Sequence, residues 1–173
     1  MSAREAWVAS PFPAVVIPAA ASVELARDLR ERFEHAVYTR YSLVDRGSYD
    51  VLDAPNVPDV IAMLAGIASE ATGRALAPRS ARVLRLGPGD YLLTRHDRVY
   101  EDRPIELVLD LSPALVEGAE IHWRHRGQVF FTMGTTPGAL ALVERGPTVM
   151  SNHTYVSKLR KTASVVRLVA ILS

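Results

Sequence analysis

Histidine and carboxylate side chains carry the reactive chemistry of this sequence, because the chain contains no cysteine. The absence of thiols excludes disulfides, thiolate zinc sites, iron–sulfur clusters and cysteine nucleophiles. Among the five histidines, His96 and His153 lie beside predicted strand ends in the second half of the chain. Asp97 follows His96 directly. Two imidazoles and one carboxylate form the ligand set of a facial iron(II) site with open coordination positions.

Two kinds of element would position these residues, and the first kind lies in residues 1–79. A short strand is predicted over Ala14–Ile17, and two amphipathic helices over 22–35 and 57–73. Both helices carry boundary signals in the form of a serine N-cap, a proline in the first turn or a terminal glycine. Residues 38–53 are polar and aromatic and fit either a strand or a loop.

Residues 80–173 have a different pattern, in which short apolar runs alternate with turns rich in glycine and proline. About eight strands at regular spacing, with no helical period between them, predict a mainly β fold. We expect a double-stranded β-helix, that is, a jelly roll or cupin-like barrel, with the helices on one outer face. The runs are Ala81–Leu86, Asp90–Thr94, Ile105–Leu111, Glu120–Arg124, Gln128–Phe131, Ala139–Glu144, Thr148–Met150, His153–Val156 and Ser164–Leu172.

Length and composition limit the classes of function. A chain of 173 residues with 49% hydrophobic residues suits one domain, 1–173, in which residues 1–79 buttress a core formed by 80–173. A formal net charge of +1 gives no general attraction to nucleic acid or anionic membranes. No secretory signal or membrane span is recognisable, so we expect a cytoplasmic protein. Its expected partner is a small-molecule or peptide substrate, and an edge strand leaves a homodimer open.

The order of these segments resembles the 2-oxoglutarate- and iron(II)-dependent oxygenases, in particular their small prolyl-hydroxylase-like members. Residues 10–17 resemble the opening strand, and residues 86–97 the segment that carries the His-x-Asp ligands of the family. Residues 118–121 stand where many members have Gly-Gly-Glu-Leu, and 146–153 resemble the strand leading to the distal histidine. In the final strand, 164–172, a basic residue of the family pairs with the far carboxylate of 2-oxoglutarate.

The resemblance implies two cofactors, Fe(II) and 2-oxoglutarate, and assigns His96, Asp97 and His153 to iron. No further catalytic residue is implied. The sequence departs from the family because His96 and Asp97 are adjacent. Ligands separated by one residue point to the same side of an extended chain, whereas adjacent side chains point to opposite sides. A strict His-x-Asp spacing would require Arg95 or Arg98 as a ligand, and arginine cannot bind iron.

Three explanations of this departure are open. The strand ends or bulges at His96, so that the pair converges in a turn. Alternatively, the acid is Glu101 or Asp102, a few residues further along. In the third explanation, the site has lost iron altogether.

Arg167 is the favoured residue for binding 2-oxoglutarate under the resemblance. It stands alone in an apolar run, where a charge must face a cavity or a partner to offset its desolvation. Arg160 and Lys161 are the alternatives. Two further arginines, Arg82 and Arg85, cannot share a strand face because their spacing is odd, so at most one of them points inward.

The stretch from Glu120 to Arg126 is rich in residues that could contact a substrate. With a period of two, Glu120, His122 and Arg124 share one strand face. That face either lines a pocket or is exposed with charges that favour solubility, and we prefer the second interpretation. If it lines a pocket, His122 and Arg124 would contact substrate together with Tyr91.

The sequence therefore predicts an oxygenase that hydroxylates a small molecule or a peptide side chain. Another metal-dependent reaction, of the kind that cupin-like barrels host, is an alternative within the same fold. A rival from a different class is a non-catalytic, metal-free barrel that binds a ligand or a partner protein. The adjacency of His96 and Asp97 favours that rival.

Overall fold

The computed structural model describes the backbone of residues 1–173 and every side chain except that of His96. Its helices are α1 (Ala3–Ala9), α2 (Val23–Glu34) and α3 (Pro58–Thr72), and a 3₁₀ turn, η1, spans Thr94–His96. The strands are β1 (Ala14–Ile17), β2 (Thr39–Leu43), β3 (Gly47–Asp53), β4 (Pro78–Leu86), β5 (Tyr91–Leu92), β6 (Ile105–Asp110), β7 (Ile121–His125), β8 (Gln128–Met133), β9 (Leu140–Glu144), β10 (Val149–His153) and β11 (Val165–Leu172).

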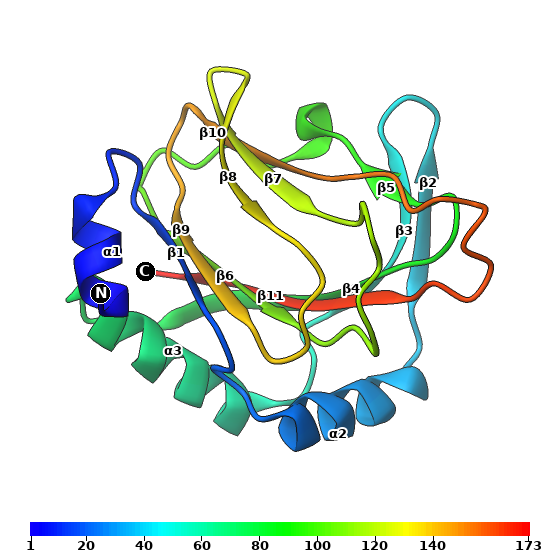
Figure 1. Cartoon of the computed structure of the whole chain (residues 1–173), viewed down its shortest axis with the longest axis horizontal. Coiled ribbons are helices and arrows are strands. Elements are labelled where there is room, and N and C mark those ends of the chain that lie inside the picture. Colours follow the sequence, from blue (N-terminus) through cyan, green and yellow to red (C-terminus); the bar gives the residue numbers. More distant parts are fainter.

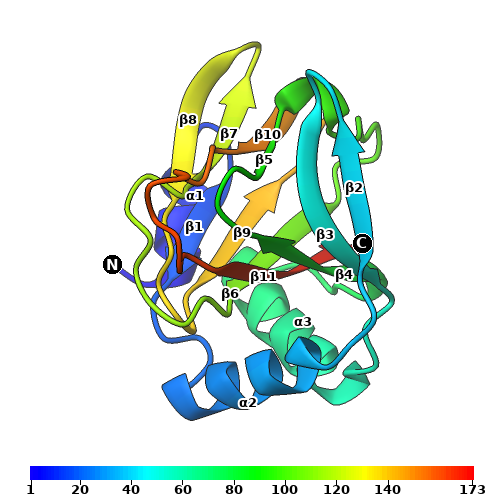
Figure 2. The same ribbon diagram turned by 90° about the vertical axis from the view of Figure 1, so that its right-hand side faces the viewer.

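The strands form one antiparallel sheet that curls into a nearly closed barrel (Figure 1). Their order is β1-β9-β6-β11-β4-β3-β5-β10-β7-β8, and β2 pairs with β3 beside this path. Figure 2 shows β6, β11 and β4 next to the helices, and β5, β10 and β7 on the side away from them. The predicted double-stranded β-helix with helices on one outer face is confirmed.

Alternation along β11 divides the core into two parts. Its residues Val166, Leu168 and Ala170 face outward and pack in one cluster with the apolar sides of α2 and α3. Val165 and Val169 face inward and belong to a second cluster inside the barrel. Removing this apolar surface from water, at about 25 cal/mol per Å², holds the helices against the sheet. The intervening inward position, Arg167, places a charge inside the barrel.

Most predicted elements agree with the structure, and a few differ. Residues 38–53 form the β2–β3 hairpin. The two runs predicted around Thr148 and His153 are one strand, β10, because the polar residues between them keep the strand alternation. Helix α1 is not among the predicted elements, although Ser2 and Glu5 form a capping box at its start.

The segment that carries His96 and Asp97 is held in place by the approach of β5 to β3. Gly47 pairs with Leu92, and a Cβ at Gly47 would lie 2.6 Å from the carbonyl oxygen of Tyr91. Glycine therefore allows these strands to meet. The predicted strand ends early, at Leu92, and η1 follows it. Within the described chain, no helix combines the length and apolar character needed to cross a bilayer.

Candidate functional site

The barrel interior contains two clusters of charged side chains, each centred on a buried arginine. We call them the Arg145 cluster and the Arg167 cluster. Arg145 follows β9, and Arg167 lies in the middle of β11. The first comprises Arg145, Asp97 and Glu106, and the second comprises Arg167, His153 and Asp110.

The Arg145 guanidinium is 1% exposed and uses all three of its nitrogens. Its Nη1 donates to Glu106 Oε2 and its Nη2 to Asp97 Oδ2, each at 2.5 Å. Nε donates to the carbonyl oxygen of Val149 at 3.3 Å. The indole of Trp123 donates a further hydrogen bond of 2.9 Å to Glu106. The cluster is therefore a complete buried network of two carboxylates around one guanidinium.

Asp97 turns its carboxylate towards β10. Its backbone is extended after η1, at φ −76° and ψ 149°. Oδ2 accepts hydrogen bonds from the Ser151 amide at 2.5 Å and hydroxyl at 3.1 Å, and Oδ1 accepts one from the Arg98 amide at 2.9 Å. Burial raises the pKa of Asp97, and the Glu106 carboxylate adds to this rise against the opposing effect of Arg145.

The Arg167 cluster is less completely paired. Arg167 Nη1 donates to His153 Nδ1 and Nη2 to the carbonyl oxygen of Ala119, each at 2.9 Å. Asp110, opposite Arg167 in the sheet register, accepts a 2.6 Å hydrogen bond from the Ser112 hydroxyl through Oδ1. Among the described residues, Arg167 Nε and Asp110 Oδ2 have no partner. Burial lowers the pKa of Arg167 to about 10 and raises the pKa of Asp110.

The protonation of His153 follows from these contacts. Burial lowers the pKa of His153 well below its usual value, and the positive charges of Arg167 and Arg82 add to the effect. The imidazole is therefore neutral near pH 7. Arginine can only donate, so Nδ1 must accept the bond from Arg167 and Nε2 must carry the proton. Neither ring nitrogen has a lone pair available in this arrangement.

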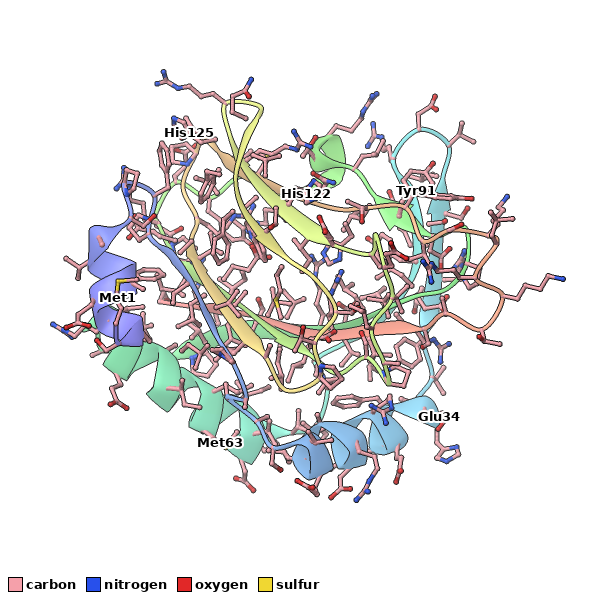
Figure 3. The ribbon with its side chains drawn as sticks, in the orientation of Figure 1. Met1, Glu34, Met63, Tyr91, His122 and His125 are labelled. Carbon is pink, nitrogen blue, oxygen red and sulfur yellow. The ribbon has the colours of Figure 1, made fainter. Side chains whose placement is uncertain are left out.

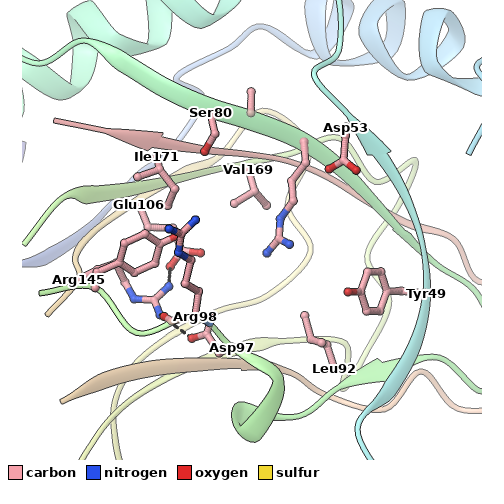
Figure 4. A pocket seen from close by; sticks show the side chains of 13 residues that line it. Tyr49, Asp53, Ser80, Leu92, Asp97, Arg98, Glu106, Arg145, Val169 and Ile171 are labelled. Carbon is pink, nitrogen blue, oxygen red and sulfur yellow. Dashed lines mark hydrogen bonds and ion pairs between the residues drawn. The ribbon is translucent and has the colours of Figure 1, made fainter. Parts of the chain in front are cut away.

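A cavity of about 200 Å³ opens beside the Arg145 cluster (Figure 4). Its wall combines charged, aromatic and aliphatic side chains from β3, β4, β6 and β11 and from the segment after η1. Arg82 points inward to this cavity, whereas Arg85 lies on the outer side of β4 and pairs with Asp50. The lining residues are Tyr49, Asp53, Ser80, Ala81, Arg82, Leu92, Asp97, Arg98, Tyr100, Glu106, Arg145, Val169 and Ile171.

The predicted iron ligands are distributed over the two clusters. Asp97 belongs to the Arg145 cluster and His153 to the Arg167 cluster, while the side chain of His96 lies outside the described part of the structure. The alternative acids are on the surface, where Glu101 is exposed and Asp102 pairs with an arginine of β4. No group of three metal-binding side chains occurs among the described residues.

The residues predicted for 2-oxoglutarate fall into two environments. Arg167 is buried in the barrel and contacts His153, the predicted distal ligand. Arg160 and Lys161 are exposed in the loop between β10 and β11, where Arg160 pairs with Glu117. Of the three candidates, Arg167 alone is placed in the interior, as its isolation in an apolar run predicted.

The residues predicted to contact substrate lie away from the cavity. On β7, Trp123 points into the barrel, so His122 and Arg124 lie on its outer face. His122 pairs with Glu120 at 2.7 Å, and Arg124 donates to Asn152. Figure 3 marks His122 on β7 and Tyr91 on β5 as separate positions. The preferred interpretation of an outward-facing strand surface agrees with this placement.

Sequence reasoning missed Arg145, Glu106 and Asp110 as interior residues. A usable signal was present in the segment Ile-Glu-Leu-Val-Leu-Asp over Ile105–Asp110, where two acids two strand periods apart share a face of an apolar strand. Charges at such positions must find partners inside the fold. Arg145 carried no comparable signal, because it stands at the end of an apolar run.

Comparison with solved structures identifies proteins of the same architecture. One is an oxidoreductase of the 2OG-Fe(II) oxygenase family from Burkholderia pseudomallei, 15% identical, with a TM-score of 0.67 over 92% of this chain and 85% of that chain. Another is the viral collagen prolyl hydroxylase of Paramecium Bursaria Chlorella virus-1, 12% identical, with a TM-score of 0.68 over 92% and 94%. A prolyl-4-hydroxylase from Pseudomonas putida is 13% identical, with a TM-score of 0.67 over 94% and 92%.

The chain has the fold of the 2OG-Fe(II) oxygenases. The resemblance drawn from the order of its segments is thus confirmed for the architecture. At these identities the likeness establishes the fold and leaves the activity to be argued from the site. No protein-family model matches the chain, and no sequence among curated proteins is significantly similar to it.

Proposed function

We propose that this protein is a metal-independent ligand-binding protein built on the oxygenase fold. The observation that carries the proposal is that an arginine engages each predicted iron ligand whose side chain is described. Arg145 pairs with Asp97, and Arg167 donates to His153. The cavity beside Asp97 supplies the space for a ligand.

The donor atoms do not fit an iron(II) ion in this arrangement. Asp97 already receives hydrogen bonds on both oxygens, and a metal there would face the Arg145 guanidinium at close range. His153 presents an N–H at Nε2, whereas a metal needs a lone pair. Arg98 also stands in the acid position of a His-x-Asp motif that begins at His96.

The 2-oxoglutarate site of the family is not reproduced either. In Arg167, both Nη atoms donate to protein acceptors, and Nε has no partner among the described residues. Arg167 is also absent from the lining of the cavity. The residue therefore supports His153 and the Ala119 carbonyl rather than a free binding surface.

The second candidate function is the iron- and 2-oxoglutarate-dependent oxygenase, acting on a small molecule or a peptide side chain. Two observations favour it: the shared fold, and the contact between Arg167 and His153, which joins two residues that the resemblance assigns to one site. It requires Arg167 to release His153 and Arg145 to release Asp97. This candidate makes the opposite prediction about metal.

Metal titration separates the two candidates. Anaerobic protein is titrated with iron(II) and then 2-oxoglutarate, while the melting temperature and the visible spectrum are followed. We expect no metal-dependent rise in melting temperature. A metal raises the melting temperature only if it binds the native state, and the proposed function gives that state no metal site. A rise together with a visible charge-transfer band would establish the oxygenase, provided that His153→Ala abolishes both signals. The matched control is His35→Ala, which removes an exposed histidine at the end of α2.

A further inference from the structure

We propose that the cavity binds a small organic carboxylate through Arg82 and Arg98. This inference rests on the metal-independent function proposed above and specifies the ligand. It depends on the charges of the cavity wall, on the partners these charges already have, and on the volume and apolar surface of the cavity.

Arg82 is the central cation of the cavity. It lies on β4 in the same alternation as Leu84 and Leu86, which are buried inside the barrel, so its side chain points inward. It is half-buried, and no hydrogen bond or ion pair joins it to another described side chain. Asp53 faces it in the strand register but is exposed and does not pair with it. A partly desolvated guanidinium without a counter-charge indicates a place for an anion.

Arg98 supplies a second cation at the same cavity. Its guanidinium lies 5.5 Å from the centre of the Tyr100 ring, and it has no carboxylate partner among the described side chains. The amide nitrogen of Arg98 donates to Asp97, and its carbonyl oxygen accepts from Arg145. The backbone at this position is therefore fixed while the charged group is available.

The other charges of the cavity do not compete for the ligand. All three nitrogens of Arg145 donate to protein acceptors, namely Asp97, Glu106 and the Val149 carbonyl, and its charge is balanced by the two acids. The carboxylates of Asp97 and Glu106 are in turn paired with Arg145. Among the described residues of the cavity wall, the cations without a carboxylate partner are thus Arg82 and Arg98. A carboxylate can accept two parallel hydrogen bonds from one guanidinium.

The size and wall of the cavity define the rest of the ligand. A cavity of about 150 Å³ is known to hold benzene, so the 200 Å³ here suits a carboxylate with a body of about one ring. Leu92, Val169 and Ile171 provide an apolar surface for that body. Inorganic phosphate would meet the same arginines but would leave this surface without a contact. The combination favours a carboxylate with a hydrocarbon part.

Isothermal titration calorimetry in buffer with a chelator tests the proposal. The probes are benzoate, hexanoate and succinate, with benzamide as the uncharged analogue of benzoate and inorganic phosphate as the competing anion. We expect at least one carboxylate to bind and benzamide to bind at least tenfold more weakly than benzoate. Arg82→Ala should weaken carboxylate binding at least tenfold, and Arg98→Ala should weaken it by a smaller factor. Arg46→Ala, which removes an exposed arginine of the β2–β3 turn, should leave it unchanged.

Arg82→Lys serves as the second variant if Arg82→Ala does not fold, because it keeps the charge and loses the forked donor geometry. The assignment would be overturned if carboxylate binding were unchanged by Arg82→Ala and by Arg82→Lys. It would also be overturned if benzamide bound as tightly as benzoate, if phosphate bound more tightly than the carboxylates, or if none of the three carboxylates bound. If that failure accompanies unchanged melting in iron(II), the metal-independent function stands and the ligand class is wrong. Carboxylate binding that is absent in the chelator buffer and appears only when the titration is repeated with iron(II) and no chelator would instead overturn the proposed function.

Discussion

The Arg145 cluster and the Arg167 cluster place the same kind of group, a fully buried guanidinium, in two different states. Arg145 has two carboxylates at 2.5 Å and a backbone acceptor for its Nε. Arg167 donates to a neutral histidine and a carbonyl oxygen, and Asp110, opposite it in the sheet register, has one oxygen without a partner among the described residues. Burial disfavours both charges, but Glu106 and Asp97 outweigh it and raise the pKa of Arg145, whereas burial lowers the pKa of Arg167 to about 10.

The difference shows how the barrel handles charge in its interior. In the Arg145 cluster, the attraction between opposite charges and a set of good hydrogen bonds offset the cost of desolvation. The Arg167 cluster keeps its charge with less compensation. Burial lowers the pKa of His153 and keeps the imidazole neutral, and the charge of Arg167 adds to this effect. Substitutions in the Arg145 cluster should therefore lower the stability of the protein strongly. Substitutions in the Arg167 cluster should cost less, and the stability contributed by this cluster should depend on pH.

The largest expected effect is the loss of Arg145. Arg145→Ala leaves Asp97 and Glu106 buried without a counter-charge, which should lower the free energy of unfolding by about 3–5 kcal/mol. Urea denaturation measures the change. Arg145→Lys should cost less than Arg145→Ala because it keeps the positive charge. It should still destabilise the protein, because an ammonium group lacks the forked donors that contact both acids. Equal stability of the alanine variant and the wild type would show that the cluster is not a stabilising network.

The next effect is a pH dependence that originates at His153. Its folded-state pKa is lowered, so the unfolded chain binds the proton more readily, and stability is lost as pH falls below the unfolded value of about 6.5. The loss should be about 2 kcal/mol between pH 6.5 and pH 5. Asp97 and Asp110, whose pKa values are raised by burial, act in the opposite direction.

His153→Gln isolates this contribution, since glutamine keeps an acceptor for Arg167 and cannot titrate. The difference between wild type and variant, measured by urea denaturation at several pH values, should shrink by about 2 kcal/mol on acidification, as the wild type loses its advantage. The contributions of Asp97 and Asp110 cancel in this difference. A difference that is constant with pH would mean that His153 is not held neutral.

The smallest effect is expected at Asp110. Asp110→Asn removes a buried charge that is only partly compensated and keeps the oxygen that accepts from Ser112. Its stability should lie within about 1 kcal/mol of the wild type, in either direction. Glu106→Gln is the matched substitution in the Arg145 cluster and should cost about 1.5–3 kcal/mol, because it weakens two charge-assisted hydrogen bonds. Similar costs for both would remove the distinction between the clusters.

Much of the fold was predictable because it depends on local pattern. The cap at Ser22, the proline at 58 and the glycine at 73 mark the ends of α2 and α3, and all three are visible in the sequence. The strand runs from residue 80 onward are separated by turn residues and were placed close to their observed bounds. The β2–β3 hairpin was left open between strand and loop, because its polar and aromatic residues show no clear alternation of apolar and polar side chains.

The site was predictable only in part. Arg167 and His153 were chosen from separate arguments, and the structure brings them into contact. Asp97 was singled out as a candidate iron ligand, but its partner in the structure, Arg145, was not identified. The pairing joins residues far apart in the sequence, and no periodicity links the end of β9 to the turn after β5.

By itself, the sequence determined helices α2 and α3, most of the alternating strands and the inward position of Arg167, because capping, turn chemistry and the period of two act over a few residues. Only the tertiary structure decided which charges meet inside the barrel. Closing the sheet sets strands that are distant in sequence side by side, and the low polarity of the interior then makes each buried charge depend on the one neighbour that can reach it. For this chain, the neighbour of each described candidate iron ligand is an arginine.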